Sequence, residues 1–345
     1  MKKFSHNILF GSESGHTLEG IEVAYHTIGH LSPSKDNVVW VCHALTANSD
    51  VQDWWDGLFG TERLFGPETH FIVCANILGS CYGSTGPTSL NPKSRQPYYH
   101  DFPLLTIRDL VKAHQLLADH LGIDKIQTLI GGSLGGFQAM EWAIDQPDRI
   151  ENLILIATAA KHSAWGIAFN ESQRLAIESD YTWLWRDDKA GWFGLRAARA
   201  IALLSYRHYD AYNQTQSDKT DKIDDFKAAS YQRYQGKKLV DRFNAHSYYA
   251  LTKTMDTHNV GRGRISTEHS LGLIKAKTHV IGISSDVLFP PVEQAYLAEH
   301  IPGATLDIIE SSFGHDGFLI ETETISELIQ KRKNVLNLVG EKSCQ

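Results

Sequence analysis

Residues 126–144 of the chain read IQTLIGGSLGGFQAMEWAI, in which a short apolar run leads into a glycine-rich turn around Ser133 and then into a helical pattern. The turn contains the pattern G-x-S-x-G, and this pattern requires a strand before it and a helix after it. The glycines allow a turn so tight that side chains would collide with neighbouring elements, while Ser133 is held in a strained backbone with its hydroxyl exposed. The segment predicts a nucleophilic serine. The alternative is a plain strand-to-helix connection in which Ser133 caps the helix.

Further apolar runs resemble the one before Ser133. They are short, continuous and bounded by polar residues or by Gly and Pro, which is typical of parallel strands buried on both faces. They occupy residues 38–42, 71–75, 153–157, 279–283 and 305–309, and helical patterns lie at residues 107–121 and 137–144. We therefore predict an α/β fold with a mostly parallel sheet, and an antiparallel hairpin at the sheet edge for residues 6–26.

The alternation of strands and helices stops between about residues 161 and 272. This segment has helical patterns and many aromatic residues but no convincing apolar strand, and it is too long for a bare loop in a compact domain. We predict that residues 161–272 form a helical lid insertion over the sheet, with a polar, exposed stretch at residues 214–225. Residues 1–160 and 273–345 would then form the core domain.

The chain has 345 residues, with 33 Lys and Arg against 40 Asp and Glu, and its formal net charge is -7. An acidic balance without a basic stripe argues against a nucleic-acid-binding protein. No apolar window of about 18 residues predicts a membrane helix, and residues 1–6 lack the features of a signal peptide. We expect a soluble, cytoplasmic protein without a metal site. Its cysteines are expected to be reduced and non-catalytic; they are Cys42, Cys74, Cys81 and Cys344.

Two later strands are followed by the partners that an activated serine needs. Asp286 follows the strand predicted at residues 279–283, and His315 follows the strand predicted at residues 305–309. Serine, then an acid, then histidine is a known chain order of the catalytic triad. Because the carboxyl ends of parallel strands meet at one edge of a sheet, we predict that His315 is the base and Asp286 the acid that orients it. The alternative for Asp286 is a turn residue that caps its own loop.

Acyl transfer also needs backbone N–H groups that stabilise the oxyanion of the tetrahedral intermediate. The residue after the nucleophile, Leu134, would supply one of them. The loop at residues 42–47 leaves the strand at residues 38–42 at the same edge of the sheet, and we assign Leu45 as the second donor. An ordinary polar loop is the alternative for this segment.

Together with their neighbours, these residues resemble the homoserine O-acetyltransferase family, α/β-hydrolase-fold acyltransferases that open methionine biosynthesis. The resemblance spans nearly the whole chain, and few of its segments are needed by a generic esterase. The segments are His43-Ala44-Leu45-Thr46, residues 76–87 (NILGSCYGSTGP), Asp101-Phe102-Pro103, Thr106-Ile107-Arg108-Asp109, the turn at residues 131–136, Phe169-Asn170-Glu171, Met255-Asp256-Thr257-His258 and Gly314-His315-Asp316.

The resemblance implies that the family's catalytic triad falls on the serine, aspartate and histidine already named. It also implies that Asp316 and Arg199 bind substrate, with Arg207 as the alternative to Arg199, and that two copies form a homodimer through their insertions. Ala47 stands where the family has glycine. Homoserine is a zwitterion, so a selective site should offer it one cation and one anion. The alternatives to substrate binding are an ion pair that stabilises the insertion for Arg199, and a cap of the helix near residues 317–325 for Asp316.

The expected reaction is a two-step transfer of the acetyl group from acetyl-CoA to L-homoserine through an acyl-serine, with acetyl-CoA as co-substrate and no cofactor. Its rivals are transfer from succinyl-CoA, transfer to serine, a carboxylic-ester hydrolase with the same triad, and a non-catalytic binding protein. The loops around Leu45 and Leu134 contribute no Lys or Arg, which favours a neutral acetyl group over a succinyl group with its carboxylate.

Overall fold

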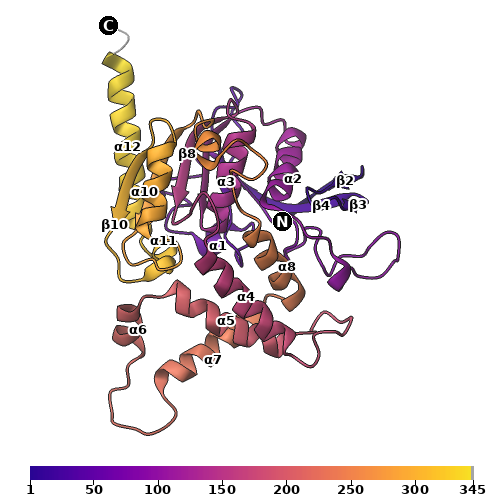
Figure 1. Cartoon of the computed structure of the whole chain (residues 1–345). Coiled ribbons are helices and arrows are strands. Elements are labelled where there is room, and N and C mark those ends of the chain that lie inside the picture. Colours follow the sequence, from indigo (N-terminus) through magenta and orange to yellow (C-terminus); the bar gives the residue numbers. More distant parts are fainter. Residues whose placement is uncertain (343–345) are drawn as a thin grey trace.

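A computed structural model describes the fold of residues 1–342 and the side chains of residues 1–332. At its centre lies an eight-stranded sheet in the order β1-β4-β6-β5-β7-β8-β9-β10 (Figure 1). Its strands are β1 (Lys2–His6), β4 (Ile21–Ile28), β5 (Val38–Cys42), β6 (Phe71–Ala75), β7 (Ile126–Gly132), β8 (Ile150–Ile156), β9 (Lys277–Ile283) and β10 (Thr305–Ile309).

The strands from β5 to β10 all run parallel to one another, as the apolar runs predict. The predicted α/β fold with a mostly parallel sheet is therefore confirmed. The N-terminal part is more elaborate than the single hairpin predicted for residues 6–26. Strand β1 pairs with β4, β4 is also antiparallel to β6, and the short strands β2 (Phe10–Gly11) and β3 (Thr17–Leu18) form a separate two-stranded sheet.

Hydrophobic clusters cover both faces of the sheet. On β5, Trp40 and Cys42 belong to the cluster with α2 (Ile107–His120), α3 (Leu134–Asp145) and α10 (Pro291–His300). Val39 and Val41 belong to the opposite cluster with α1 (Val51–Trp54), α11 (Gly317–Ile320) and α12 (Thr322–Lys342). Because both faces are buried, a strand such as β5 has no polar position, which explains its continuous apolar run.

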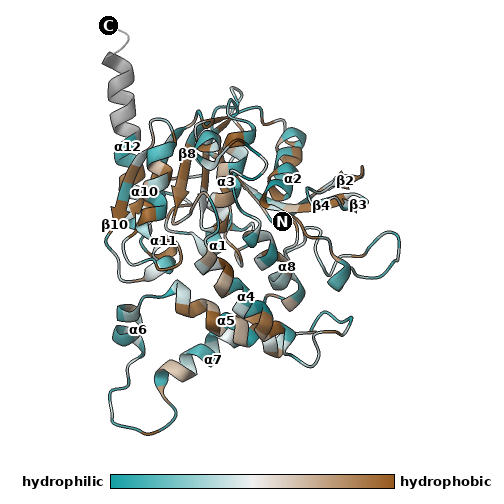
Figure 2. Cartoon of the chain, viewed as in Figure 1, coloured by the Kyte–Doolittle hydropathy of each residue, from teal (hydrophilic) through white to brown (hydrophobic). Residues whose placement is uncertain are grey.

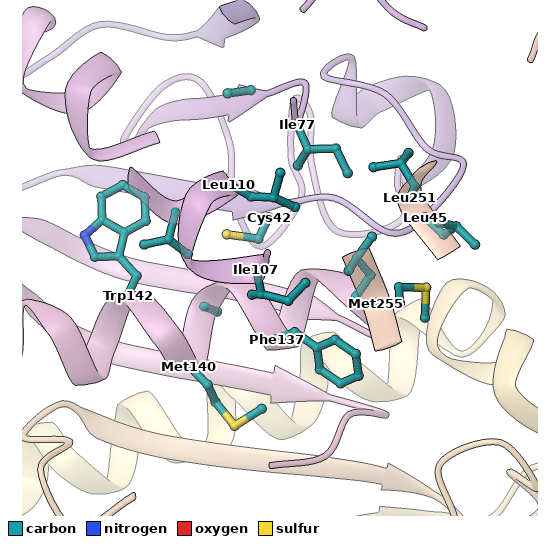
Figure 3. Packing of buried hydrophobic residues seen from close by; sticks show 14 of the residues in the cluster. Cys42, Leu45, Ile77, Ile107, Leu110, Phe137, Met140, Trp142, Leu251 and Met255 are labelled. Carbon is teal, nitrogen blue, oxygen red and sulfur yellow. The ribbon is translucent and has the colours of Figure 1, made fainter. Parts of the chain in front are cut away.

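Only helices lie between β8 and β9, apart from a short bridge between Lys161 and Asn259. They are α4 (Ala164–Glu178), α5 (Trp192–Tyr206), α6 (Tyr209–Gln216), α7 (Lys227–Val240), α8 (Ala245–Asp256) and α9 (Thr267–Leu271). Figure 1 shows α4 to α7 as a layer beyond one end of the sheet, while α8 leads back towards it. Leu251 and Met255 of α8 pack near Leu45 (Figure 3), so the insertion shares a hydrophobic cluster with the core. The domain limits at residues 161 and 272 stay a prediction.

The cysteines of the described residues, Cys42, Cys74 and Cys81, are free thiols. Burial raises the pKa of all three, that of Cys81 to about 11, so they are poor nucleophiles. Cys344 lies outside the described residues. Within residues 1–342, none of the helices is both long and apolar enough to span a membrane.

The turn between β7 and α3 packs so closely that glycine is required. A Cβ on Gly135 would lie 2.0 Å from the carbonyl oxygen of Cys42, and a Cβ on Gly131 would lie 2.2 Å from the carbonyl oxygen of Gly135. Both obstacles are backbone atoms, which no change of rotamer removes. The start of α3 is therefore in direct contact with the end of β5.

Replacing Gly135 by alanine should strain this contact. We expect Gly135→Ala to lower the free energy of unfolding by about 1–3 kcal/mol or more, the usual cost of overpacking, measured by thermal or urea denaturation. The matched control is Gly11→Ala, because a Cβ on Gly11 would meet nothing within 4 Å. Equal stability of the two variants would show that the contact does not constrain the fold.

Candidate active site

Ser133 lies between β7 and α3 in a conformation that side chains rarely adopt, with φ 56° and ψ -126°. Hydrogen bonds hold it there: its N–H donates to the Ile156 carbonyl at 3.0 Å, and the Thr158 hydroxyl donates to its carbonyl at 3.0 Å. Its side chain caps nothing in α3, which removes the helix-capping alternative. The strain directs the hydroxyl away from the helix, as a nucleophile requires.

The structure brings together the three residues predicted as the triad. His315 Nε2 lies 2.9 Å from Ser133 Oγ, and His315 Nδ1 lies 2.7 Å from Asp286 Oδ2. All three are at most 6% exposed. Since the carboxylate accepts the Nδ1 proton, Nε2 is free to accept the serine proton. The arrangement suits proton transfer from a nucleophilic serine.

Asp286 also caps its own loop, which was the alternative to a catalytic role for this residue. Its Oδ1 accepts hydrogen bonds from the N–H groups of Leu288 and Phe289 at 2.8 and 2.9 Å, while Oδ2 contacts His315. The N–H of Gly314 donates to the Ser285 hydroxyl at 2.9 Å, which joins the loop after β9 to the loop after β10. The two loops are therefore fixed to each other, and the acid is held at a constant distance from the base.

Aromatic rings surround the imidazole of His315. The ring centroids of Phe289 and Phe318 lie 5.2 Å from it, and that of Tyr206 lies 5.8 Å away. Tyr206 is the last residue of α5, so the insertion reaches the base directly. Burial raises the pKa of Tyr206, which keeps its phenol neutral. These rings limit the access of water to the proton-transfer pair.

The two predicted oxyanion donors lie at the expected edge of the sheet. Leu134 is the first residue of α3, so its N–H has no acceptor within the helix. Leu45, in the loop after β5, lines the same cavity as Ser133. The donor roles of Leu45 and Leu134 stay predictions.

A cavity of about 430 Å³ opens beside the serine and histidine. Core and insertion both contribute to its wall, and the charged side chains that line it are Asp53, Arg199, Lys238, Arg242 and Asp316. The two residues predicted to bind substrate, Arg199 and Asp316, thus line the same cavity as the serine and the histidine. In the described part of the chain, no three His, Cys, Asp or Glu side chains are grouped as metal ligands.

The charges of this cavity are only partly paired. Asp316 Oδ2 accepts a hydrogen bond from Arg207 Nε at 2.8 Å, and its side chain does not cap α11. Arg199 has no acid within ion-pair distance among the described side chains; its guanidinium lies over the Tyr206 ring, 5.4 Å from the centroid. The ion pair within the insertion, given as the alternative role of Arg199, is therefore not formed among the described side chains, and Arg207 joins the insertion to Asp316 of the core. An unpaired cation faces the cavity.

Sequence reasoning missed Tyr206, Lys238 and Arg242. Arg242 follows α7 and donates hydrogen bonds to the Thr46 carbonyl at 2.5 Å and to the Tyr82 hydroxyl at 2.6 Å, so the insertion contacts the oxyanion loop. Helical periodicity shows which face of a helix is buried but does not show which loop that face meets. The only signal for Tyr206 was its place beside the candidate Arg207.

Comparisons with known proteins agree with this geometry. Residues 37–322 match the family described as alpha/beta hydrolase fold. The homoserine O-acetyltransferase of Cyclobacterium marinum is 50% identical over 318 residues and covers 92% of this chain and 91% of that protein. The homoserine O-acetyltransferase of Nostoc punctiforme is 44% identical and covers 93% of each.

Solved structures share the fold. The homoserine O-acetyltransferase from Bacillus anthracis superposes with a TM-score of 0.89 at 22% identity and covers 96% of each chain. Esterase E22 superposes with a TM-score of 0.87 at 23% identity and covers 96% of this chain and 98% of its own. Since one fold hosts several activities, the family is decided by the closer sequence relatives. The chain belongs to the homoserine O-acetyltransferase family, within the α/β-hydrolase fold.

Proposed function

We infer that the chain is a homoserine O-acetyltransferase, which transfers the acetyl group of acetyl-CoA to the hydroxyl of L-homoserine. The observation that carries this proposal is a hydrogen-bonded triad whose serine and histidine line one cavity with Arg199 and Asp316. A hydrolase needs only the triad and the oxyanion donors. The additional cation, Arg199, and the additional anion, Asp316, suit an acceptor that is a zwitterion, as homoserine is.

In the first half-reaction, His315 takes the proton of Ser133, and the serine oxygen attacks the thioester carbonyl of acetyl-CoA. The N–H groups of Leu134 and Leu45 stabilise the oxyanion of the tetrahedral intermediate. As the intermediate collapses, His315 returns the proton to the departing sulfur, and CoA leaves an acetylated serine.

In the second half-reaction, homoserine binds with its carboxylate at Arg199 and its ammonium at Asp316. Arg199 supports this role because it has no acid partner among the described side chains, whereas Arg207 is already paired with Asp316. Asp316 uses Oδ2 for Arg207, which leaves Oδ1 for the ammonium. His315 then deprotonates the homoserine hydroxyl, which attacks the acetyl carbonyl. As the intermediate collapses, the bond to Ser133 Oγ breaks, His315 returns the proton to the serine oxygen, and O-acetylhomoserine leaves.

Acetyl remains the preferred acyl group, although the cavity is more basic than its loops predict. Arg199, Lys238 and Arg242 reach it from the insertion, so the absence of cations in the oxyanion loops does not by itself exclude a succinyl carboxylate. The names of the two relatives described above specify acetyl transfer. Acetyl-CoA acts as co-substrate, and the proposed reaction needs no bound cofactor or metal.

The enzyme is proposed to act in the cytoplasm as a homodimer. Its free thiols suit a reducing compartment. On α5, Phe193, Ala197 and Leu204 are exposed at helical spacing and form an apolar stripe, and Figure 2 shows hydrophobic residues along this helix. Phe193 is 57% exposed and Leu204 58%. A second copy of the insertion, carrying the same stripe, would cover this surface with two-fold symmetry.

Removing the nucleophile tests the proposed reaction. Ser133→Ala should lower turnover by roughly 10³- to 10⁶-fold, as loss of a triad serine does elsewhere, with CoA release measured by a thiol reagent. Mass spectrometry of the wild type after acetyl-CoA alone should find one acetyl group on the peptide containing Ser133. If the wild type never becomes acetylated, the proposed reaction is wrong. If the wild type clearly prefers succinyl-CoA at a fixed homoserine concentration, the proposed acyl donor is wrong.

Asp316→Asn should damage the second half-reaction more than the first, because the ammonium at Asp316 belongs to homoserine. Homoserine-dependent turnover should fall about 10- to 100-fold, the cost of a hydrogen bond to a charged group, while the first burst of CoA release persists. Rapid-quench measurement of both steps decides this. Arg207→Gln is the matched control, since it breaks the same ion pair without removing the carboxylate. Equal loss in both half-reactions would point to a structural role for Asp316.

The dimer proposal predicts that charge on the α5 stripe separates the subunits. Phe193→Lys and Leu204→Lys should each raise the dimer dissociation constant at least about 10-fold, as expected for buried interface anchors, in sedimentation velocity. Val292→Lys on α10 is the control, because Val292 is also exposed but lies outside the insertion. A monomeric wild type would contradict the proposal.

A further inference from the structure

Two buried side chains outside the triad contact the backbone next to the N–H groups proposed to stabilise the oxyanion. His43 follows β5, and Gln138 lies on α3; both are 0% exposed. Neither lines the cavity that contains Ser133. Any effect on the reaction must therefore act through the backbone groups that they contact.

The hydrogen bonds of His43 define its tautomer. Nδ1 lies 2.8 Å from the Ala44 carbonyl oxygen, and Nε2 lies 3.2 Å from the Ile77 backbone nitrogen. A carbonyl oxygen only accepts and a backbone N–H only donates, so Nδ1 carries the ring proton and Nε2 accepts. Burial lowers the pKa of His43 to about 4, which keeps this neutral form at physiological pH.

This contact controls the direction of the Leu45 N–H. The Ala44 carbonyl and the Leu45 N–H belong to one planar trans peptide and point in opposite directions. A ring that fixes the carbonyl on one side therefore fixes the N–H on the other. The Ala47 N–H also donates to the Ala44 carbonyl, at 3.1 Å, and closes the loop behind it.

Gln138 joins the two segments that carry the proposed oxyanion donors, the loop of Leu45 and the first turn of α3 with Leu134. Its Nε2 lies 3.2 Å from the carbonyl oxygen of His43 and 3.2 Å from that of Leu134. One amide group thus connects the loop after β5 to the first turn of α3. Cys42, Leu45 and Phe137, the residue before Gln138, belong to one buried hydrophobic cluster (Figure 3).

We propose that His43 and Gln138 are positioning residues of the oxyanion site, His43 by orienting the Leu45 N–H and Gln138 by fixing the loop of Leu45 relative to Leu134. This inference rests on the proposed acyl transfer at Ser133. Oxyanion donors act in the transition state because they are already oriented when charge develops, and loss of one donor costs about 10²- to 10³-fold in kcat. Misdirecting a donor that is still present should cost less.

The test uses the full-length enzyme with the variants His43→Leu and Gln138→Met. Each variant keeps a side chain of similar size but loses the side-chain N–H that contacts the backbone carbonyl. Each should lower kcat about 10- to 100-fold with little change in KM for either substrate, because the affected interaction forms in the transition state. Affinity for a small alkyl boronic acid, whose tetrahedral serine adduct needs the same donors, should fall in parallel. His114→Leu is the control: His114 is equally buried, and its ring nitrogens have no hydrogen-bond partner among the described residues.

A conservative variant separates positioning from packing. In His43→Asn the side-chain N–H can reach the same carbonyl, so kcat and boronate affinity should recover most of what His43→Leu loses, whatever the melting temperatures. The inference is wrong if folded His43→Leu and Gln138→Met bind the boronate as tightly as the wild type. It is also wrong if His43→Asn does not recover the affinity that His43→Leu loses. If the wild type forms no acetyl-enzyme, the proposed function fails, and the boronate measurements alone decide the positioning role.

Discussion

The contact between the end of β5 and the start of α3 is the constraint on which the rest of the site depends. A Cβ on Gly135 would overlap the Cys42 carbonyl, so the helix can start at this place only without a side chain there. The same contact brings the loop of Leu45 beside Ser133, whose positive φ directs its hydroxyl away from the helix. Nucleophile and oxyanion loop are thus held by backbone packing, which is the least adjustable part of a protein interior.

The parts of the site that depend on this sheet could be predicted from the sequence. Alternate residues of β5 enter opposite hydrophobic clusters, so an uninterrupted apolar run was a reliable sign of a parallel strand. Once the strands are parallel, residues just past their carboxyl ends must share one edge. For this reason the chain order of Ser133, Asp286 and His315 was enough to predict that they meet, although 182 residues separate the serine from the histidine.

The insertion could not be read in the same way. Its helices are visible in the sequence, but their placement depends on contacts between residues far apart in the chain, such as Arg207 with Asp316, 109 residues later. An amphipathic pattern says that one face of α5 is buried and does not say that Tyr206 reaches the imidazole of His315. The N-terminal strands were harder still, since β2 and β3 contain only two residues each and carry no periodic signal.

Core and insertion contribute different parts of the proposed chemistry. The core supplies the triad and Asp316, while the insertion supplies Tyr206 and all three cations that line the cavity. In the proposed reaction the groups that acylate Ser133 come from the core, and any water that reached the acetyl-serine would hydrolyse it. In the proposed reaction a zwitterionic acceptor would gain one ion pair from the core and one from the insertion. Water would gain neither, so the acceptor would compete with water only where the insertion covers the sheet. On the proposed reaction, the packing of α5 and α7 over the cavity would therefore set the balance between transfer and hydrolysis in this chain, and both reactions would use the same triad.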